Sequence, residues 1–200
     1  MLLVGVTGGV ATGKSTVAQM FKLCGAVVIN ADQLARDMVH PDRPAWRAIV
    51  RSFGKEVLNP DRTIDRHALG AIVFHDKGKL RRLERIIHPR VAREQARLAK
   101  HAARQDPRAV VVYDVPLLFE AGIDKRVDKI IVVIADQETQ IARLKKRNGL
   151  SRSQALRRIR SQMSLAQKIR RADIVIDGTR SRALLRAQVR RLYRSLRHSR

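Results

Sequence analysis

Residues 8–15 read Gly8-Gly9-Val10-Ala11-Thr12-Gly13-Lys14-Ser15, and this stretch (the phosphate loop) fits the pattern G-x-x-x-x-G-K-[ST]. The apolar run 2–7 before it is predicted to be a buried strand. The apolar residues after it have the i, i+3, i+4, i+7 spacing of an amphipathic helix: Val17, Met20, Phe21 and Cys24. Between a strand and a helix N-terminus, such a loop points its backbone N–H groups at phosphate oxygens. The stretch therefore predicts a nucleoside triphosphate site.

Side chains of the phosphate loop have expected roles in binding ATP and its metal. Lys14 is expected to reach the β- and γ-phosphates, and the Ser15 hydroxyl is expected to bind Mg²⁺. The expected contacts to ATP come from Gly9, Ala11, Thr12, Gly13, Lys14, Ser15 and Thr16. A glycine-rich turn without a ligand is the alternative, and the Gly-Lys-Ser sequence between two regular elements argues against it.

Apolar strands alternate with helices along the rest of the chain. Four further strands are predicted at 26–29, 109–113, 129–135 and 172–177. Helices are predicted over most of 33–105, with breaks at Pro41, Pro44, Asn59-Pro60-Asp61 and His88-Pro89, and over the basic stretch 138–170. A last helix carries one apolar stripe of Leu185, Val189, Leu192 and Leu196. This alternation predicts an α/β fold whose parallel sheet is covered on both faces.

Two aspartates follow predicted strands, at the edge where open α/β sheets bind their ligands. Asp32 is placed to orient an acceptor hydroxyl and accept its proton, or equally to cap a helix that starts near Gln33. Asp114 resembles the carboxylate that ends a Walker B strand and helps hold Mg²⁺, with a cap on the turn before Pro116 as the alternative.

Arg143 and Arg147 lie one helical turn apart, so they share a helix face. In a segment that folds over bound ATP, two guanidinium groups neutralise charge on the transferred phosphoryl group. A solvated basic face is the alternative, and spacing alone does not separate the two interpretations.

The charge of the chain is strongly positive, with 42 Lys and Arg against 18 Asp and Glu. From Arg143 onward there are 19 basic residues and two acids, a net charge of +17. Such a field attracts polyanions without choosing among them, so non-specific polyanion binding is expected as a side property. The single cysteine, Cys24, excludes an intramolecular disulfide. With no basic leader and no run of about 18 apolar residues, a cytoplasmic location is expected.

Two seven-residue signatures add specific information. They are Leu83-Glu84-Arg85-Ile86-Ile87-His88-Pro89 and Asp114-Val115-Pro116-Leu117-Leu118-Phe119-Glu120. Shorter matches accompany them at Thr7-Gly8-Gly9, Gly13–Thr16, Asn30-Ala31-Asp32 with Arg36, Phe53-Gly54, Asp65-Arg66 with Leu69, and Gln140-x-x-Arg143-x-x-x-Arg147. Together with the phosphate loop, these motifs resemble the dephospho-CoA kinase family from Val4 to about Asp177.

The resemblance implies transfer of the ATP γ-phosphate to the ribose 3′-hydroxyl of dephospho-CoA, giving coenzyme A and ADP. It implies a three-layer P-loop kinase fold with a five-stranded parallel sheet. The core would be 1–32, 106–137 and 171–200, the helical acceptor-binding insertion 33–105, and the lid 138–170. The implied catalytic residues are Asp32 as base, Lys14, Arg143 and Arg147. The implied acceptor site contains Arg36, His88, Asp114, Pro116 and Leu117, and the implied metal site Ser15 and Asp114.

Three positions depart from the family pattern. Asn30 replaces a usual Asp, so that position is not expected to supply the base. Val10-Ala11-Thr12 replaces the more usual Ile-Gly-Ser, which narrows the allowed backbone of the loop. Asp177-Gly178 replaces a usual Asp-Asn, which removes any contact of an Asn side chain to the nucleotide.

Two rival functions follow from the same residues. A P-loop kinase for another small molecule, such as a nucleoside or nucleotide, would share this architecture. A nucleic-acid-dependent NTPase would suit the basic C-terminal third. The chain has few aromatic residues to stack bases and no helicase motif series, and the leucine stripe predicts an ordinary packed helix.

Overall fold

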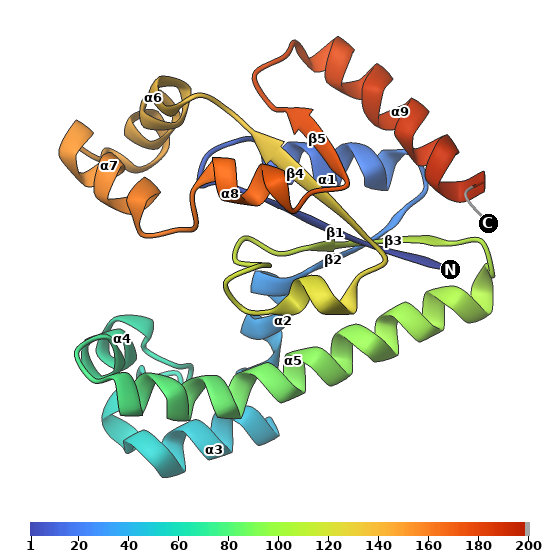
Figure 1. The fold of residues 1–200 in the computed structure, drawn as a ribbon. Helices are drawn as coiled ribbons and strands as arrows, with labels where there is room; N and C mark the ends of the chain where they lie inside the picture. The colour runs from blue at the N-terminus through green and yellow to red at the C-terminus, as the bar shows by residue number, and fades with distance from the viewer. Residues whose placement is uncertain (199–200) are drawn as a thin grey trace. The chain divides into compact units, whose positions relative to one another are not determined.

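The computed structural model describes residues 1–198 and divides them into two compact units, each drawn in Figure 1. The sheet unit comprises Met1–Asn30 and Ala99–Arg200, and the helical unit comprises Ala31–Leu98. The last two residues of the expected core segment 171–200 lie outside the described part. The boundaries expected for core, insertion and lid stay a prediction.

The sheet unit contains five parallel strands in the order β2-β3-β1-β4-β5. They are β1 Leu2–Gly8, β2 Val27–Asn30, β3 Val110–Asp114, β4 Lys129–Ile134 and β5 Ile174–Asp177. The predicted α/β fold with a five-stranded parallel sheet is thus confirmed. Because all strands run the same way, their carboxyl ends share one edge, where Asn30 pairs in register with Asp114.

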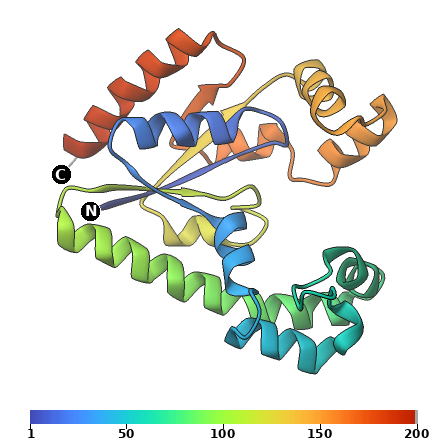
Figure 2. The same cartoon turned by 180° about the vertical axis from the view of Figure 1, so that it is seen from behind.

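Helices α1 (Lys14–Leu23) and α9 (Arg182–His198) cover one face of the sheet, and both views show them side by side (Figures 1 and 2). Val17 and Phe21 of α1 and Val189 of α9 are fully buried in the same core. The predicted stripe on α9 packs there, although Leu192 is only partly buried. Tyr193, which the stripe did not include, takes a buried position beside it.

The basic stretch 138–170 is helical, as predicted, and it is divided into three helices: α6 Gln137–Asn148, α7 Arg152–Arg160 and α8 Leu165–Arg170. Their starts follow from capping residues. Ser151 and Ser164 each accept a hydrogen bond from the backbone N–H three residues on and complete a capping box with a glutamine. A short 3₁₀ helix, η2 Ile123–Arg126, precedes β4.

The helical unit is built from α2 Ala31–Met38, α3 Pro44–Phe53, η1 Lys55–Val57, α4 Arg66–Phe74 and most of α5 Lys77–Gln105. Its core gathers around Trp46, Ile49, Phe53 and Leu69. The Trp46 indole N–H donates to the Arg62 carbonyl at 2.8 Å, so the one tryptophan of the chain is satisfied where it is buried.

The predicted break at His88-Pro89 is wrong, because Pro89 lies inside α5. Proline costs a helix the hydrogen bond to the carbonyl four residues earlier. Both Pro89 and Arg85 are exposed, so water can reach that carbonyl, while Ile86 keeps the helix anchored in the core. Among the helices of residues 1–198, none is long and apolar enough to cross a bilayer.

Candidate functional site

The phosphate loop joins β1 to α1 through a strained turn. Gly13 has φ +100°, a left-handed conformation that side chains disfavour. Ala11 has φ +60°, which costs a residue with a Cβ about 1–2 kcal/mol, so the departure from the family's glycine falls where a glycine would relieve strain. Thr12 is buried, and its hydroxyl donates to the Gly9 carbonyl at 2.9 Å, which closes the turn from within.

Residues of the 138–170 segment hold the backbone of this loop. The Arg143 guanidinium donates to the Ala11 carbonyl at 3.1 Å and to the Gly178 carbonyl at 2.8 Å. Gln162 accepts the Val10 N–H at 2.9 Å. Arg147 is exposed, and its Nε donates to the neighbouring Asn148 at 3.0 Å. The two arginines predicted to act as a pair therefore have different surroundings in this structure.

Lys14 and Asp114 form an ion pair at the carboxyl edge of the sheet. The Asn30 amide donates to the other Asp114 carboxylate oxygen at 3.0 Å. Asp114 is 2% exposed, and its partners within the described residues are these two side chains and no turn N–H, which disfavours the cap interpretation. Because Asn30 is neutral, the trio carries no net charge, whereas an Asp at that position would add a carboxylate next to Asp114.

The other predicted residues divide between the two units. In the sheet unit, Ser15 and Thr16 are exposed at the start of α1, and Leu117 is a 45% exposed apolar residue. In the helical unit, Asp32 is the second residue of α2, so it does not occupy the N-cap position of a helix that starts near Gln33. Asp32, Arg36 and His88 are all exposed.

Lys168 is a site-forming residue that the sequence did not single out. Its side chain is fully buried, and its Nζ contacts the Glu120 carboxylate at 2.9 Å and the Pro116 carbonyl at 3.2 Å. Thr7 donates to the same Pro116 carbonyl at 3.0 Å. Burial opposes ionisation of Glu120, yet hydrogen bonds from Lys168 and from backbone N–H groups outweigh it and lower its pKa. The loop 116–120 is thereby fixed to α8.

The residues expected to bind Mg²⁺ are compatible with that ion. Within residues 1–198, no three His, Cys, Asp or Glu side chains lie close enough together to form a metal site of their own. Mg²⁺ commonly binds through one or two carboxylates, substrate phosphates and water. Asp114 and the exposed Ser15 hydroxyl are oxygen donors of that kind at the phosphate loop. The set fits a metal that arrives with the nucleotide.

Gly178 offers a sharp test of this geometry. A Cβ added there would lie 2.0 Å from the backbone oxygen of Thr12, so this backbone has no room for the Asn of the family pattern. We expect Gly178→Ala to lower the free energy of unfolding by about 1–3 kcal/mol and to weaken ATP binding, because the phosphate loop must shift. Urea denaturation and calorimetric ATP titration measure both.

Gly70→Ala is the matched control, since its Cβ would meet only the exposed side chain of Phe74 on α4. There we expect a stability gain of about 0.5–1 kcal/mol from helix propensity. If the Gly178 variant is as stable as the wild type, the close approach between Gly178 and the loop is refuted.

Comparisons with known proteins agree with this architecture. Residues 2–183 match the family described as dephospho-CoA kinase. A dephospho-CoA kinase from Geobacter metallireducens is 52% identical over 179 residues, which cover 89% of this chain and 88% of the relative. A Thermus thermophilus protein of solved structure has a TM-score of 0.81 at 32% identity, covering 98% and 96% of the two chains. A dephospho-CoA kinase structure from Campylobacter jejuni has a TM-score of 0.71 at 27% identity, covering 98% of each chain.

Proposed function

The chain belongs to the dephospho-CoA kinase family, and from this premise we propose how its residues transfer a phosphoryl group. The reaction moves the ATP γ-phosphate to the ribose 3′-hydroxyl of dephospho-CoA and yields coenzyme A and ADP. The observation that carries the proposal is the Lys14–Asp114 ion pair at the end of the phosphate loop. It keeps a cation at the point where triphosphate oxygens would arrive.

ATP binds with its phosphates in the phosphate loop, and Lys14 exchanges Asp114 for the β- and γ-phosphates. The backbone of Gly9 to Gly13 supplies N–H donors, and Ser15 and Thr16 follow at the N-terminus of α1. Arg143 acts by holding the loop through its two carbonyl contacts. Arg147 is exposed, one turn along the same helix, and its positive charge stabilises the negative charge of the transferred phosphoryl group.

Asp32 accepts the proton of the 3′-hydroxyl in this proposal. It follows Asn30 by two residues, so its Cα lies within about 7.6 Å of the strand end that contacts Asp114. Its carboxylate is exposed and thus open to a substrate. Asn30 cannot serve as base, because an amide has no useful proton affinity.

Mg²⁺ would be held by Ser15, Asp114 and the phosphates, and when bound it neutralises charge on the triphosphate. For the acceptor, Pro116 and the exposed Leu117 follow Asp114 on a loop fixed by Lys168. We assign Arg36 and His88 of the helical unit to the same substrate, as the family resemblance implies. The cytoplasmic location stays a prediction.

The test follows coenzyme A formation from ATP and dephospho-CoA, with and without a chelator of Mg²⁺. We expect product that depends on dephospho-CoA and disappears when the metal is removed. Faster phosphorylation of a nucleoside or nucleotide would refute this acceptor. ATP hydrolysis that requires DNA or RNA would move the protein to the nucleic-acid-dependent class.

A further inference from the structure

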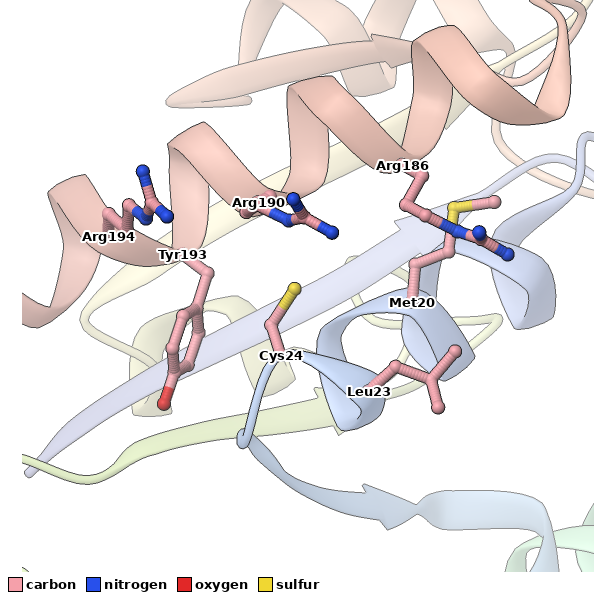
Figure 3. Close-up of a pocket in the computed structure, with 7 residues that line it drawn as sticks. All are labelled: Met20, Leu23, Cys24, Arg186, Arg190, Tyr193 and Arg194. Atoms are coloured by element: carbon pink, nitrogen blue, oxygen red, sulfur yellow. The ribbon is translucent and has the colours of Figure 1, made fainter.

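A cleft of about 280 Å³ lies in the sheet unit between the last turn of α1 and the middle of α9 (Figure 3). Its lining consists of Met20, Leu23, Cys24, Arg186, Arg190, Tyr193 and Arg194. None of these residues has a role in the proposed binding of ATP or of the acceptor. The phosphate loop meets the opposite, N-terminal end of α1.

The three arginines of the cleft are spaced four residues apart, so they share one face of α9. Within the described part of the chain, their guanidinium groups have no hydrogen-bond or ion-pair partner. Arg197 of the same helix differs, because it pairs with Asp106 at 2.9 Å. Three arginines without a partner among residues 1–198 therefore border one cleft.

The floor beneath these charges is apolar. Met20 and Tyr193 are buried, and Leu23 is 70% exposed at the edge. Figure 3 shows the side chains of Arg186 and Arg190 reaching from α9 toward α1, over Met20 and Cys24. A cationic border above an apolar floor suits a ligand with an anionic head and an organic body.

We propose that this cleft binds a small organic anion that carries a diphosphate group. Guanidinium groups bind phosphate oxygens through paired N–H donors. A diphosphate group carries about two to three negative charges, which matches three arginines, whereas a single carboxylate would leave two of them uncompensated. The cleft is slightly smaller than the roughly 300–1,000 Å³ of drug-sized ligand pockets, so it holds the diphosphate head and the adjoining part of the molecule.

A membrane surface is a poorer occupant for the same residues. A helix that lies on a bilayer inserts a continuous apolar face. On α9 that face is already packed in the core through Leu185, Val189 and Leu196. A nucleic acid would bind the arginines through its own phosphates and would not need the apolar floor. The binding experiment therefore includes single-stranded DNA as an alternative ligand.

Cys24 supplies a site-specific measurement, because it lines the cleft and is the only cysteine of the chain. The rate of its alkylation by iodoacetamide, a neutral reagent, is measured with inorganic diphosphate and with ADP at about 0.15 M salt. We expect the rate to fall about tenfold when the anion is at ten times its Kd. Anion bound at the phosphate loop does not cover this thiol, so the two sites are read separately.

Arg186→Gln with Arg190→Gln should abolish the protection, and Arg191→Gln should keep it, because Arg191 has the same charge on the same helix outside the cleft. Equal protection in both variants, or none in the wild type, overturns the proposal. Stronger protection by single-stranded DNA or by anionic vesicles at equal phosphate concentration overturns it as well. If the thiol resists alkylation, the rise in Tm caused by diphosphate is measured in a Lys14→Met chain, with and without the two cleft substitutions. The proposal expects the rise to disappear with the two substitutions, and an equal rise in both chains overturns it.

Discussion

Asp32→Asn is expected to lower the turnover number for coenzyme A formation by about 10²–10⁴-fold, the usual contribution of a general base. The amide keeps the size and hydrogen-bonding reach of the carboxylate but cannot take the proton of the 3′-hydroxyl. Because Asp32 lies in the first turn of α2 and is exposed, the change should leave folding intact. The coenzyme A formed in a single turnover is measured in quenched samples, which separates the rate of the chemical step from the rate of product release.

The control is Asp37→Asn on the same helix, where the carboxylate is 41% exposed and accepts a hydrogen bond from Gln33 at 2.8 Å. It removes the same charge from α2, and we expect activity within about twofold of the wild type. ATP affinity should be unchanged in both variants. Comparable rates in the Asp32 variant and the wild type would keep the kinase reaction and assign the proton to another group.

Local patterns predicted the parts of the fold that depend on neighbours in the chain. The phosphate loop is one such part, because β1, the glycines and the first turn of α1 are consecutive in sequence. The five strands were equally visible as apolar runs, and the alternation of strands with helices predicted that the sheet is parallel, but it did not predict the strand order. The strained φ of Ala11 lies where the sequence pattern indicated a missing glycine.

Contacts between distant segments were beyond such patterns. Asp114 was predicted to share the metal site of the phosphate loop, but its direct ion pair with Lys14, 100 residues away in the sequence, was not predicted. Lys168 was hidden among 42 basic residues, and nothing in its spacing marks the one that is fully buried. The role of Arg143 at the transferred phosphoryl group stays a prediction, and its contacts with the Ala11 and Gly178 carbonyls were not visible in the spacing. The helix break predicted at Pro89 was wrong because packing of α5 outweighed the local cost of a proline in a helix.

Lys168→Met is expected to lower the free energy of unfolding by about 3 kcal/mol, near the lower end for breaking a buried ion pair. The methionine fills the buried space but removes the cation paired with Glu120 and one of the two donors to the Pro116 carbonyl, which keeps its hydrogen bond from Thr7. Glu120 is 24% exposed and keeps the Met163 N–H at 3.0 Å, so water and that bond limit the loss. Urea denaturation measures the change.

Lys129→Met is the matched control, since Lys129 and Asp173 form an exposed pair with side chains 47% and 37% accessible. Exposed pairs contribute about 0–1 kcal/mol, so this change should be small. Adding Glu120→Gln to Lys168→Met should recover part of the loss, because no unpaired carboxylate then remains. No recovery would mean that the methionine itself, and not the orphaned charge, destabilises the protein.

The same pair predicts a pH dependence of stability. Burial disfavours the charged form of Glu120, but its hydrogen bonds prevail and hold its pKa in the folded protein below that of a free glutamate. The unfolded chain therefore binds the proton more readily, and the pair's contribution is complete at pH values above the unfolded pKa. It is lost as pH falls through the lowered pKa of the folded state. The stability difference between the wild type and Glu120→Gln should narrow over that acidic range. A difference that is constant with pH would show that folding leaves the pKa of Glu120 unchanged, and a difference that widens as pH falls would show that its pKa is raised.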